Sequence, residues 1–276
     1  MKQVVVITGL AQGMGRQVAG LLADRGHTIA GFDLDPQGLA SLDAELASKG
    51  AERYLIPLDI TFRAGIRAFR DKVLEKFGRV DTVLSNVGIG FFGPFEEIDL
   101  EKALKCLEIN VIGTAAVLQA FIPAMRARRA GKIICMSSLV GQIPFPFESI
   151  YSASKFALEG MVQSLKFEVE PFGIRVAVVQ PAQVSTDFAA KIHYLPPEGS
   201  PYRDRVKRFI DRDNELIKTA PTPMQAAQKI AGIVEQDRPG RFNQVDFMSA
   251  FFLFLNRILP YRLRDFILVN HMKIKE

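Results

Sequence analysis

Short apolar runs alternate along this chain with longer segments whose apolar residues recur at helical spacing, and this alternation limits the folds it can adopt. The expected strands are residues 3–8, 28–33, 53–59, 81–86, 132–137, 174–180 and a weaker run at 241–246. The expected helices are residues 14–25, 36–49, 63–77, 98–129, 149–171 and 223–236. Because most of the strands are almost continuously apolar, we expect a parallel sheet that is covered on both faces. The prediction is an α/β fold in three layers, with a doubly wound parallel sheet of about seven strands.

Composition excludes several other classes of protein. Hydrophobic residues make up 48% and charged residues 24% of the chain, which is typical of a globular protein and not of a disordered one. The net charge of +5 is mild and the basic residues form no single run, so nucleic-acid binding is not favoured. Two cysteines and three scattered histidines predict neither a disulfide framework nor a metal site, and a reducing, cytoplasmic location is expected. We found no linker or repeat, so residues 1–276 are expected to form a single domain.

The turn after the first expected strand is rich in glycine. It reads Thr8-Gly9-Leu10-Ala11-Gln12-Gly13-Met14-Gly15, and an expected helix follows directly. Glycines permit a tight turn and let backbone N–H groups approach a pyrophosphate, and the start of a helix adds about half a positive charge. Spaced glycines also occur in ordinary turns, but their position between a strand and a helix favours a dinucleotide site. The candidate cofactor residues in this turn are Thr8, Gly9, Gln12, Gly13, Met14 and Gly15.

An aspartate ends the second expected strand, 18 residues after the last glycine of that turn. Asp33 can accept hydrogen bonds from both hydroxyls of an adenosine ribose, and its charge would repel a 2′-phosphate. No lysine or arginine follows to neutralise such a phosphate, since the next residues are Leu34, Asp35 and Pro36. The alternative role of an acid at a helix start suits Asp35 better, because a proline follows it. We therefore predict NAD(H) in preference to NADP(H), with Arg16, the nearest basic residue, pointing to solvent.

A tyrosine and a lysine four residues apart begin the expected helix 149–171. Tyr151 and Lys155 would lie on one helix face, where an ammonium group lowers the pKa of a phenol from about 10 toward neutrality. Such pairs are common on solvated helices, so the pair alone is weak evidence. Ser138 follows the fifth expected strand, 13 residues before Tyr151, and its hydroxyl could bind the same substrate oxygen. Serines after strands also stabilise turns, a role that suits Ser137.

These motifs resemble those of the short-chain dehydrogenase/reductase family over about residues 3–190. The T-G-x-x-x-G-x-G turn, the Y-x-x-x-K pair and the serine before it carry the resemblance. It implies a Rossmann-like fold and hydride transfer with a nicotinamide dinucleotide. It also matches Asn110, inside the expected helix 98–129, with a catalytic asparagine that holds a water linking the lysine to solvent. The implied catalytic residues are Asn110, Ser138, Tyr151 and Lys155.

The resemblance implies further cofactor contacts at the ends of the later strands. Asp59 matches an adenine-contacting acid, although it could instead cap the next helix. Val87 stands where the family usually has alanine, and Ala182 replaces a usual glycine, so the loop beside the nicotinamide is expected to differ. The cofactor residues implied in this way are Asp59, Ile60, Asn86, Gly88, Tyr151, Lys155, Pro181, Val184 and Thr186.

Residues around the expected reacting centre are mostly apolar, which suits a small hydrophobic substrate. Residues 187–220 interrupt the alternation with prolines and charges and are expected to form an irregular lid, the alternative being a surface excursion without function. The segment 144–147 could likewise be only a stiff packed loop. The candidate substrate residues are Phe145, Phe147, Phe188 and His193.

The apolar segment 247–270 carries interleaved arginines and is too short in its apolar part to cross a bilayer. It could lie on a membrane surface, seal the pocket or form an oligomer contact. Its L-P-x-R-L-x-D-x-x-L pattern resembles steroid, retinoid and keto-lipid dehydrogenases. The resemblance also implies a homodimer or homotetramer formed through the helices at 98–129 and 149–171.

The expected function is therefore an NAD(H)-dependent oxidoreductase that interconverts an alcohol with a ketone or aldehyde on a hydrophobic substrate, with Tyr151 as the acid and base. The alternative is a dinucleotide sensor or scaffold without activity, which would be expected to have lost the tyrosine or the lysine. Nucleotide-sugar epimerases and dehydratases share the Y-x-x-x-K pair, but their usual glycine spacing and longer carboxyl domain do not fit this chain.

Overall fold

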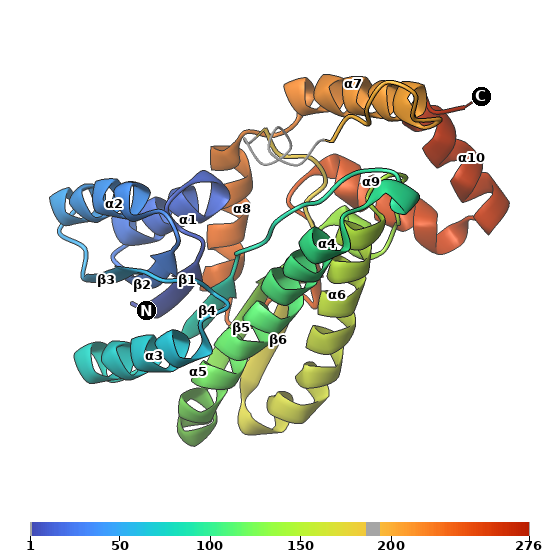
Figure 1. The fold of residues 1–276 in the computed structure, drawn as a ribbon. Coiled ribbons are helices and arrows are strands. Elements are labelled where there is room, and N and C mark those ends of the chain that lie inside the picture. Colours follow the sequence, from blue (N-terminus) through green and yellow to red (C-terminus); the bar gives the residue numbers. More distant parts are fainter. Residues whose placement is uncertain (1, 186–193, 276) are drawn as a thin grey trace.

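The computed structural model describes residues 2–185 and 194–275, which fold around a parallel sheet with the strand order β3-β2-β1-β4-β5-β6-β7 (Figure 1). The strands are β1 Val4–Thr8, β2 Thr28–Asp33, β3 Arg53–Pro57, β4 Thr82–Ser85, β5 Gly131–Met136, β6 Ile174–Val179 and β7 Phe242–Asn243. The α-helices are α1 Gly13–Asp24, α2 Pro36–Ser48, α3 Arg63–Phe77, α4 Leu100–Leu107, α5 Thr114–Arg128, α6 Ser149–Val169, α7 Arg203–Thr219, α8 Pro223–Glu235, α9 Phe247–Ile258 and α10 Tyr261–His271. The predicted doubly wound α/β fold is confirmed.

Two apolar cores lie on the two faces of the sheet. Along β1, Val5 and Ile7 point to the core covered by α1, α2 and α8, whereas Val4 and Val6 point to the core covered by α3, α5 and α6. This alternation follows from the period of two in a strand, and it explains why the strands are apolar at consecutive positions. Figure 1 shows the two helix layers on opposite sides of the sheet.

The long helix predicted at 98–129 is interrupted. Between α4 and α5 the chain forms the π-helical segment η2, Glu108–Gly113, which contains Asn110. By length and composition alone, Leu100–Arg128 could cross a membrane. In the fold, apolar side chains of this segment are part of the core, since Val117, Leu118 and Phe121 are buried against the sheet.

The expectation that residues 187–220 are irregular is wrong for much of that segment, because α7 occupies Arg203–Thr219. Val206, Phe209 and Asp213 are buried along one side of α7, at the three- and four-residue spacing of a helix. The many charged residues on its other faces hide this pattern in the sequence. The last expected strand is also shorter than predicted, with two residues in β7.

Candidate active site

A cavity of about 960 Å³ lies at the carboxyl ends of the central strands. This edge, where the strand order reverses between β1 and β4, is where open α/β sheets bind ligands. The volume is near the upper end of the roughly 300–1,000 Å³ common for small-molecule sites. The predicted site residues that line it are Gly9, Gln12, Gly13, Met14, Asp33, Asp59, Ile60, Asn86, Gly88, Ser138, Phe145, Tyr151, Lys155, Pro181 and Val184.

The glycine turn joins β1 to the start of α1 at one end of the cavity. Gly9 and Gly13 have positive φ angles of 71° and 58°, which glycine adopts without strain. A Cβ atom on Gly15 would lie 2.2 Å from the carbonyl oxygen of Gly9, so this position has no room for a side chain. Gln12 caps α1 without a side-chain hydrogen bond to its first turn. The turn therefore fits a pyrophosphate approaching the backbone N–H groups of the helix start.

Thr8 is buried, supports this turn and does not line the cavity. The buried Thr8 hydroxyl accepts hydrogen bonds from the backbone N–H groups of Asn86 (3.0 Å) and Val87 (3.1 Å). The Asn86 side-chain amide in turn donates to the carbonyl oxygens of Thr8 and Gly9. These bonds hold the loop after β4 against the glycine turn.

Asp33 ends β2 beside the turn, as predicted. Its carboxylate accepts hydrogen bonds from the backbone N–H groups of Ala11 (2.9 Å) and Asp35 (3.1 Å), which fix its orientation at the cavity wall. The prediction that Arg16 points to solvent is wrong. The Arg16 guanidinium bonds Ser41 and Glu45 on α2, because packing α1 against α2 brings that carboxylate within 2.9 Å.

Asp59 does not cap the next helix, because the N-cap residue of α3 is Phe62, and the contact of Asp59 with an adenine stays a prediction. Its carboxylate accepts hydrogen bonds from the backbone N–H and the hydroxyl of Thr61, both at 2.8 Å, and the backbone bond is the main cause of a lowered Asp59 pKa. It also lines the cavity next to Ile60. Asp59 therefore stabilises a turn and presents a carboxylate to the cavity at the same time.

Ser138, Tyr151 and Lys155 meet at the other end of the cavity. Ser138 directly follows β5, and its hydroxyl is hydrogen-bonded to the Tyr151 phenol at the start of α6. The Lys155 ammonium donates a hydrogen bond of 2.9 Å to the carbonyl oxygen of Met136 and lies 5.7 Å from the centre of the Tyr151 ring. A Cβ atom on Gly88 would lie 3.2 Å from the Lys155 Nζ atom, so glycine there keeps space beside the lysine.

Asn110 lies behind this group and does not line the cavity. The π-helical turn places its buried amide against the loop after β4, where Oδ1 accepts from the Ile89 N–H at 2.8 Å. Its Nδ2 atom donates to the Ile89 carbonyl oxygen and to the Ser154 hydroxyl, both at 2.9 Å. Asn110 thus orders the backbone next to Gly88 and Lys155.

Burial has the largest effect on the pKa values of Tyr151 and Lys155. Burial and the nearby Glu148 carboxyl raise the pKa of Tyr151 well above its ordinary value, while the hydrogen bond with Ser138 acts in the opposite direction. Burial lowers the pKa of Lys155 to about 8. In the chain by itself desolvation has the largest effect on the Tyr151 pKa, and the lowering of that pKa by Lys155 and a bound nicotinamide stays a prediction.

One of the four predicted substrate residues is found at the cavity wall in the described part of the chain. Phe145 lines the cavity, but Phe147 stacks edge-to-face on Phe209 of α7 with the ring centroids 5.7 Å apart and does not line it. Thr186, Phe188 and His193 lie outside the described residues. The sequence reasoning missed Glu148 and Asp213, which both line the cavity. The position of Glu148, three residues before Tyr151, was the available signal.

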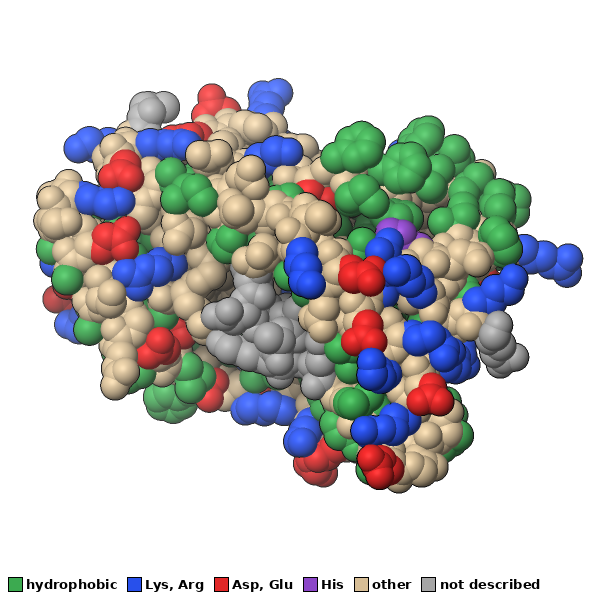
Figure 2. All heavy atoms as spheres, turned by 90° about the horizontal axis from the view of Figure 1, so that it is seen from above, with side chains coloured by type: hydrophobic (Ala, Val, Ile, Leu, Met, Phe, Trp, Pro, Cys, Tyr) green, Lys and Arg blue, Asp and Glu red, His purple; other side chains and the backbone are tan. Residues whose placement is uncertain are grey.

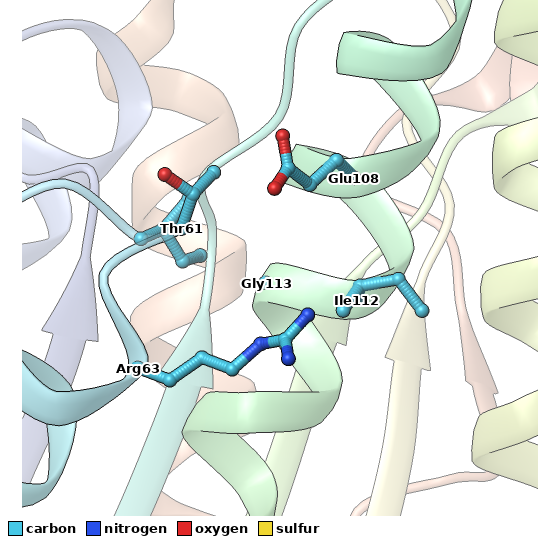
Figure 3. A pocket seen from close by; sticks show the side chains of 6 residues that line it. Thr61, Arg63, Glu108, Ile112 and Gly113 are labelled. Atoms are coloured by element: carbon cyan, nitrogen blue, oxygen red, sulfur yellow. The ribbon is translucent and has the colours of Figure 1, made fainter.

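A second hollow lies beside the π-helical segment. It is lined by Ile60, Thr61, Arg63, Glu108, Ile112 and Gly113, and Figure 3 shows how these side chains surround it. It has no space for a molecule even the size of water, so it forms no ligand site.

The fold and the large cavity define a dinucleotide-binding α/β protein with a tyrosine and lysine at its reacting end. A sequence profile described as short chain dehydrogenase matches residues 3–194. The chain belongs to the short-chain dehydrogenase/reductase family and is an oxidoreductase of the kind that uses NAD(P).

Individual relatives agree with this assignment. The chain is 30% identical to a 3-ketodihydrosphingosine reductase of Bacteroides thetaiotaomicron, over 96% of this chain and 97% of the relative. It is 35% identical to human 17-beta-hydroxysteroid dehydrogenase type 1, over 71% of this chain and 61% of the longer human protein. A short-chain dehydrogenase structure from Streptomyces avermitilis has a TM-score of 0.82 and 29% identity, covering 96% of this chain and 94% of that one.

Proposed function

We propose that this protein is an NAD(H)-dependent oxidoreductase that interconverts an alcohol with a ketone or aldehyde on a hydrophobic substrate. The observation that carries the proposal is the meeting of Ser138, Tyr151 and Lys155 at one end of a cavity whose other end is the glycine turn. When bound, the dinucleotide supplies or accepts the hydride at its nicotinamide ring.

The chain's own residues handle the proton. In the reducing direction, Ser138 donates a hydrogen bond that orients the substrate oxygen, and Tyr151 transfers its phenolic proton to that oxygen. Lys155 stabilises the phenolate left behind, because its ammonium group lies close to the ring. Oxidation of an alcohol follows the same steps in reverse, with Tyr151 accepting the proton.

The NAD(H) preference is supported by the position of Asp33. Its carboxylate lines the cavity and is fixed by the N–H groups of Ala11 and Asp35, so it cannot easily turn away from a 2′-phosphate. Arg16, the nearest cation in the turn, is paired with Glu45. Among related structures of known cofactor, one from Burkholderia phymatum is a complex with NAD and a metagenomic one is a complex with NADP.

The hydrophobic substrate is supported by the aromatic and aliphatic walls near Tyr151. Phe92, Val140 and Phe145 line the cavity and pack in one apolar cluster with Tyr151. Two of the relatives, a 3-ketodihydrosphingosine reductase and a 17-beta-hydroxysteroid dehydrogenase, are named for hydrophobic substrates.

Spectrophotometric titration tests this function. We expect oxidation of NADH by at least one member of a panel of sterol, retinoid, long-chain and small ketones or aldehydes. We expect NADH to bind at least about tenfold more tightly than NADPH, and Asp33→Ser to reduce that ratio. Tighter binding of NADPH would contradict the cofactor preference, and cofactor binding without turnover of any panel member would favour a sensor.

We further propose that copies of the chain associate as a homodimer or homotetramer through the outer faces of α4, α5 and α6. Large apolar side chains exposed to solvent along these segments include Leu104 of α4 (61% exposed), Ile112 of η2 (46%) and Phe156 of α6 (45%). Monomeric proteins seldom expose a contiguous apolar surface of large extent.

A further inference from the structure

A buried glutamate lies on α6 beyond the tyrosine and the lysine of the site. Glu159 is 2% exposed and follows Tyr151 by eight residues and Lys155 by four, so the three side chains stand on successive turns of one helix face. A buried carboxylate costs free energy that an apolar side chain in the same place would not, unless its oxygens are well hydrogen-bonded. The contacts of Glu159 therefore indicate its role.

The Glu159 carboxylate accepts hydrogen bonds from three uncharged side chains. Its Oε1 atom accepts from the Ser137 hydroxyl at 2.7 Å and from the Gln180 side-chain amide at 2.8 Å. Its Oε2 atom accepts from the Gln142 side-chain amide at 3.2 Å. Ser137 and Gln142 are the two ends of residues 137–142, which follow β5 and are called the Ser138 loop below. The acid therefore holds this loop at both ends and ties it to Gln180, directly after β6.

The glycine of the Ser138 loop also packs directly against this acid. A Cβ atom on Gly141 would lie 2.4 Å from the Glu159 Oε1 atom and 2.6 Å from the Ser137 Oγ atom, so the position has no room for a side chain. The backbone at Gly141 thus comes as close to the carboxylate as a glycine allows. Contacts at both ends and at the glycine leave the loop little freedom to move relative to α6.

The other two residues on this face of α6 bind the start of the same stretch of chain. The Lys155 ammonium donates a hydrogen bond of 2.9 Å to the carbonyl oxygen of Met136, the last residue of β5. The Tyr151 phenol is hydrogen-bonded to the Ser138 hydroxyl. Successive turns of one helix therefore hold one short segment, and Glu159 does so without lining the cavity.

We propose that Glu159 is a positioning residue, whose contacts with the Ser138 loop keep the Ser138 hydroxyl where it meets the Tyr151 phenol and the substrate oxygen. The inference rests on the proposed ketone or alcohol chemistry, in which Ser138 orients that oxygen. A donor displaced by about 1 Å loses much of its effect on a transition state. The acid should therefore influence the rate without touching the substrate.

Steady-state kinetics with NADH and a ketone that the natural protein reduces tests this inference. Glu159→Leu keeps the approximate size of the side chain but removes both acceptor oxygens, and we expect kcat to fall about tenfold or more while the dissociation constant for NADH changes less than about threefold. Glu159→Gln keeps one acceptor oxygen for Ser137 and Gln180, so its kcat should stay within about threefold of the natural value. Glu168→Leu, at an exposed glutamate of the same helix, is the matched control and should have no effect.

A second substitution separates positioning from a general loss of structure. If Glu159 acts through Ser138, Glu159→Leu should have almost no further effect on kcat in a Ser138→Ala background, because the hydroxyl that it positions is gone. An equal fall in kcat in both backgrounds would overturn the inference. Should Glu159→Leu fail to fold, Gly141→Ala displaces the same carboxylate without removing it and should lower kcat in the same way, again only when Ser138 is present. Gly160→Ala in α6 is its control, because nothing beyond its own helix lies within 4 Å of an added Cβ there.

Hydrogen exchange of backbone amides in the Ser138 loop distinguishes failure of this inference from failure of the proposed function. The Leu139 N–H donates to the Pro181 carbonyl oxygen at 2.7 Å, so its exchange reports movement of the loop. We expect it to exchange about tenfold faster or more in Glu159→Leu than in the natural protein or in Glu168→Leu. Faster exchange, with no ketone reduced by the natural protein, would uphold the positioning of the loop and refute the proposed reaction. Unchanged exchange would overturn the inference.

A separate observation concerns the outer face of α9 and α10, called the C-terminal face below. α9 has one buried residue, Ser249, and α10 has none. Large apolar side chains gather on this face, as Figure 2 shows in green at one end of the molecule. A soluble monomer seldom exposes an apolar surface of this kind, which points to a binding partner. The most exposed side chains are Phe247 (77%), Tyr261 (76%), Phe254 (59%), Phe266 (58%) and Ile258 (56%).

The charges among these apolar side chains are mostly positive. The Arg264 guanidinium lies 4.0 Å from the centre of the Tyr261 ring, and the Lys275 ammonium lies 6.0 Å from that of Phe266. Two copies that met through this face would bring like charges together, whereas anionic lipid headgroups attract them. Residues 247–275 contain one acid, Asp265, and the cations Arg257, Arg262, Arg264, Lys273 and Lys275.

We propose that the C-terminal face binds the surface of an anionic lipid bilayer. α9 and α10 have 12 and 11 residues, too few to cross a bilayer, which needs about 20. They can lie along the headgroup region instead, with the apolar side chains inserted and the arginines beside the phosphates. Leu268 and Val269 on the inner side of α10 pack against the cluster that contains Tyr151, so α10 is fixed on the fold by its opposite side.

Co-sedimentation with vesicles tests this second proposal. We expect the protein to bind vesicles of phosphatidylcholine with about one-third phosphatidylglycerol more tightly than vesicles of phosphatidylcholine alone. Phe254→Ser should weaken binding about tenfold, because it removes an inserted aromatic ring. Phe62→Ser, just before α3 and equally exposed at 59%, is the matched control and should have no effect. Equal effects of the two substitutions, no binding to either vesicle, or a lower molar mass caused by Phe254→Ser, which would assign the face to a second copy, would overturn the proposal.

Discussion

The surroundings of Tyr151 have opposing effects on the pKa of its phenol. Burial and the Glu148 carboxyl favour the neutral form, and the hydrogen bond with Ser138 favours the phenolate. In the chain by itself the first two prevail, so Tyr151 holds its proton at neutral pH. The neutral phenol is the form that reduction of a ketone requires, because the proton must pass to the substrate oxygen.

Lys155 provides a pH-dependent contribution to stability that can be measured. Burial lowers its pKa to about 8, below the roughly 10.4 of a lysine in an unfolded chain. Between these two pH values the unfolded state binds more protons than the folded state, so the contribution of Lys155 to the free energy of unfolding rises with pH. We expect the unfolding free energy of the natural protein, relative to Lys155→Met, to increase from pH 8 to pH 10.5. A flat or falling difference over this range in denaturant titrations would show that Lys155 is not desolvated.

At the scale of elements, the start of α1 depends on close contact between two backbone segments. A Cβ atom at position 15 would lie 2.2 Å from the Gly9 carbonyl oxygen, so Gly15→Ala must shift the turn or the helix. We expect it to lower the free energy of unfolding by about 1–3 kcal/mol, as overpacking does, and to weaken NADH binding about tenfold or more.

Gly232→Ala in α8 is the control for that substitution, because nothing lies within 4 Å of an added Cβ there. It should leave NADH binding unchanged and stabilise the protein by about 0.4–1 kcal/mol, since alanine favours a helix. Calorimetry and fluorescence titration measure both quantities. Unchanged NADH affinity in Gly15→Ala would refute the role given to the turn.

The elements that the sequence predicts well are those with a strong local pattern. The six longer strands and the helices between them follow from apolar runs and helical spacing, and Asp33 and Tyr151 follow from motifs at their ends. α7 was missed because charged residues outnumber the buried Val206 and Phe209, and proline-rich sequence precedes it. The π-helical turn at Asn110 depends on contacts with the loop at Ile89, far away in the sequence.

Site residues could be predicted where they form a motif of neighbouring residues. They could not be predicted where their position depends on how separate elements pack together. The glycine turn and the Tyr151–Lys155 spacing are visible in the sequence. The rotation of Arg16 toward Glu45 depends on how α1 packs on α2, and the presence of Asp213 at the cavity wall depends on where α7 lies. The high pKa of Tyr151 has the same origin, because desolvation requires the complete fold.

For the whole molecule, the exposed apolar side chains of α4, η2 and α6 predict the state of assembly. Burying Phe156, which is 45% exposed in the single chain, would stabilise a contact between copies. We expect light scattering during gel filtration to give two or four times the 30.7 kDa mass of one chain. Phe156→Ser should lower that mass, and Phe62→Ser should not. A monomer at micromolar concentration in the natural protein would contradict the proposed assembly.

The proton transfer assigned to Tyr151 is tested most directly by Tyr151→Phe, measured with NADH and a ketone that the natural protein reduces. The substitution removes one oxygen atom and leaves the ring in its packing against Phe92. We expect kcat to fall by about 10²–10⁴-fold while the dissociation constant for NADH changes less than about threefold. Turnover within a factor of a few of the natural protein, at unchanged cofactor affinity, would show that another group transfers the proton.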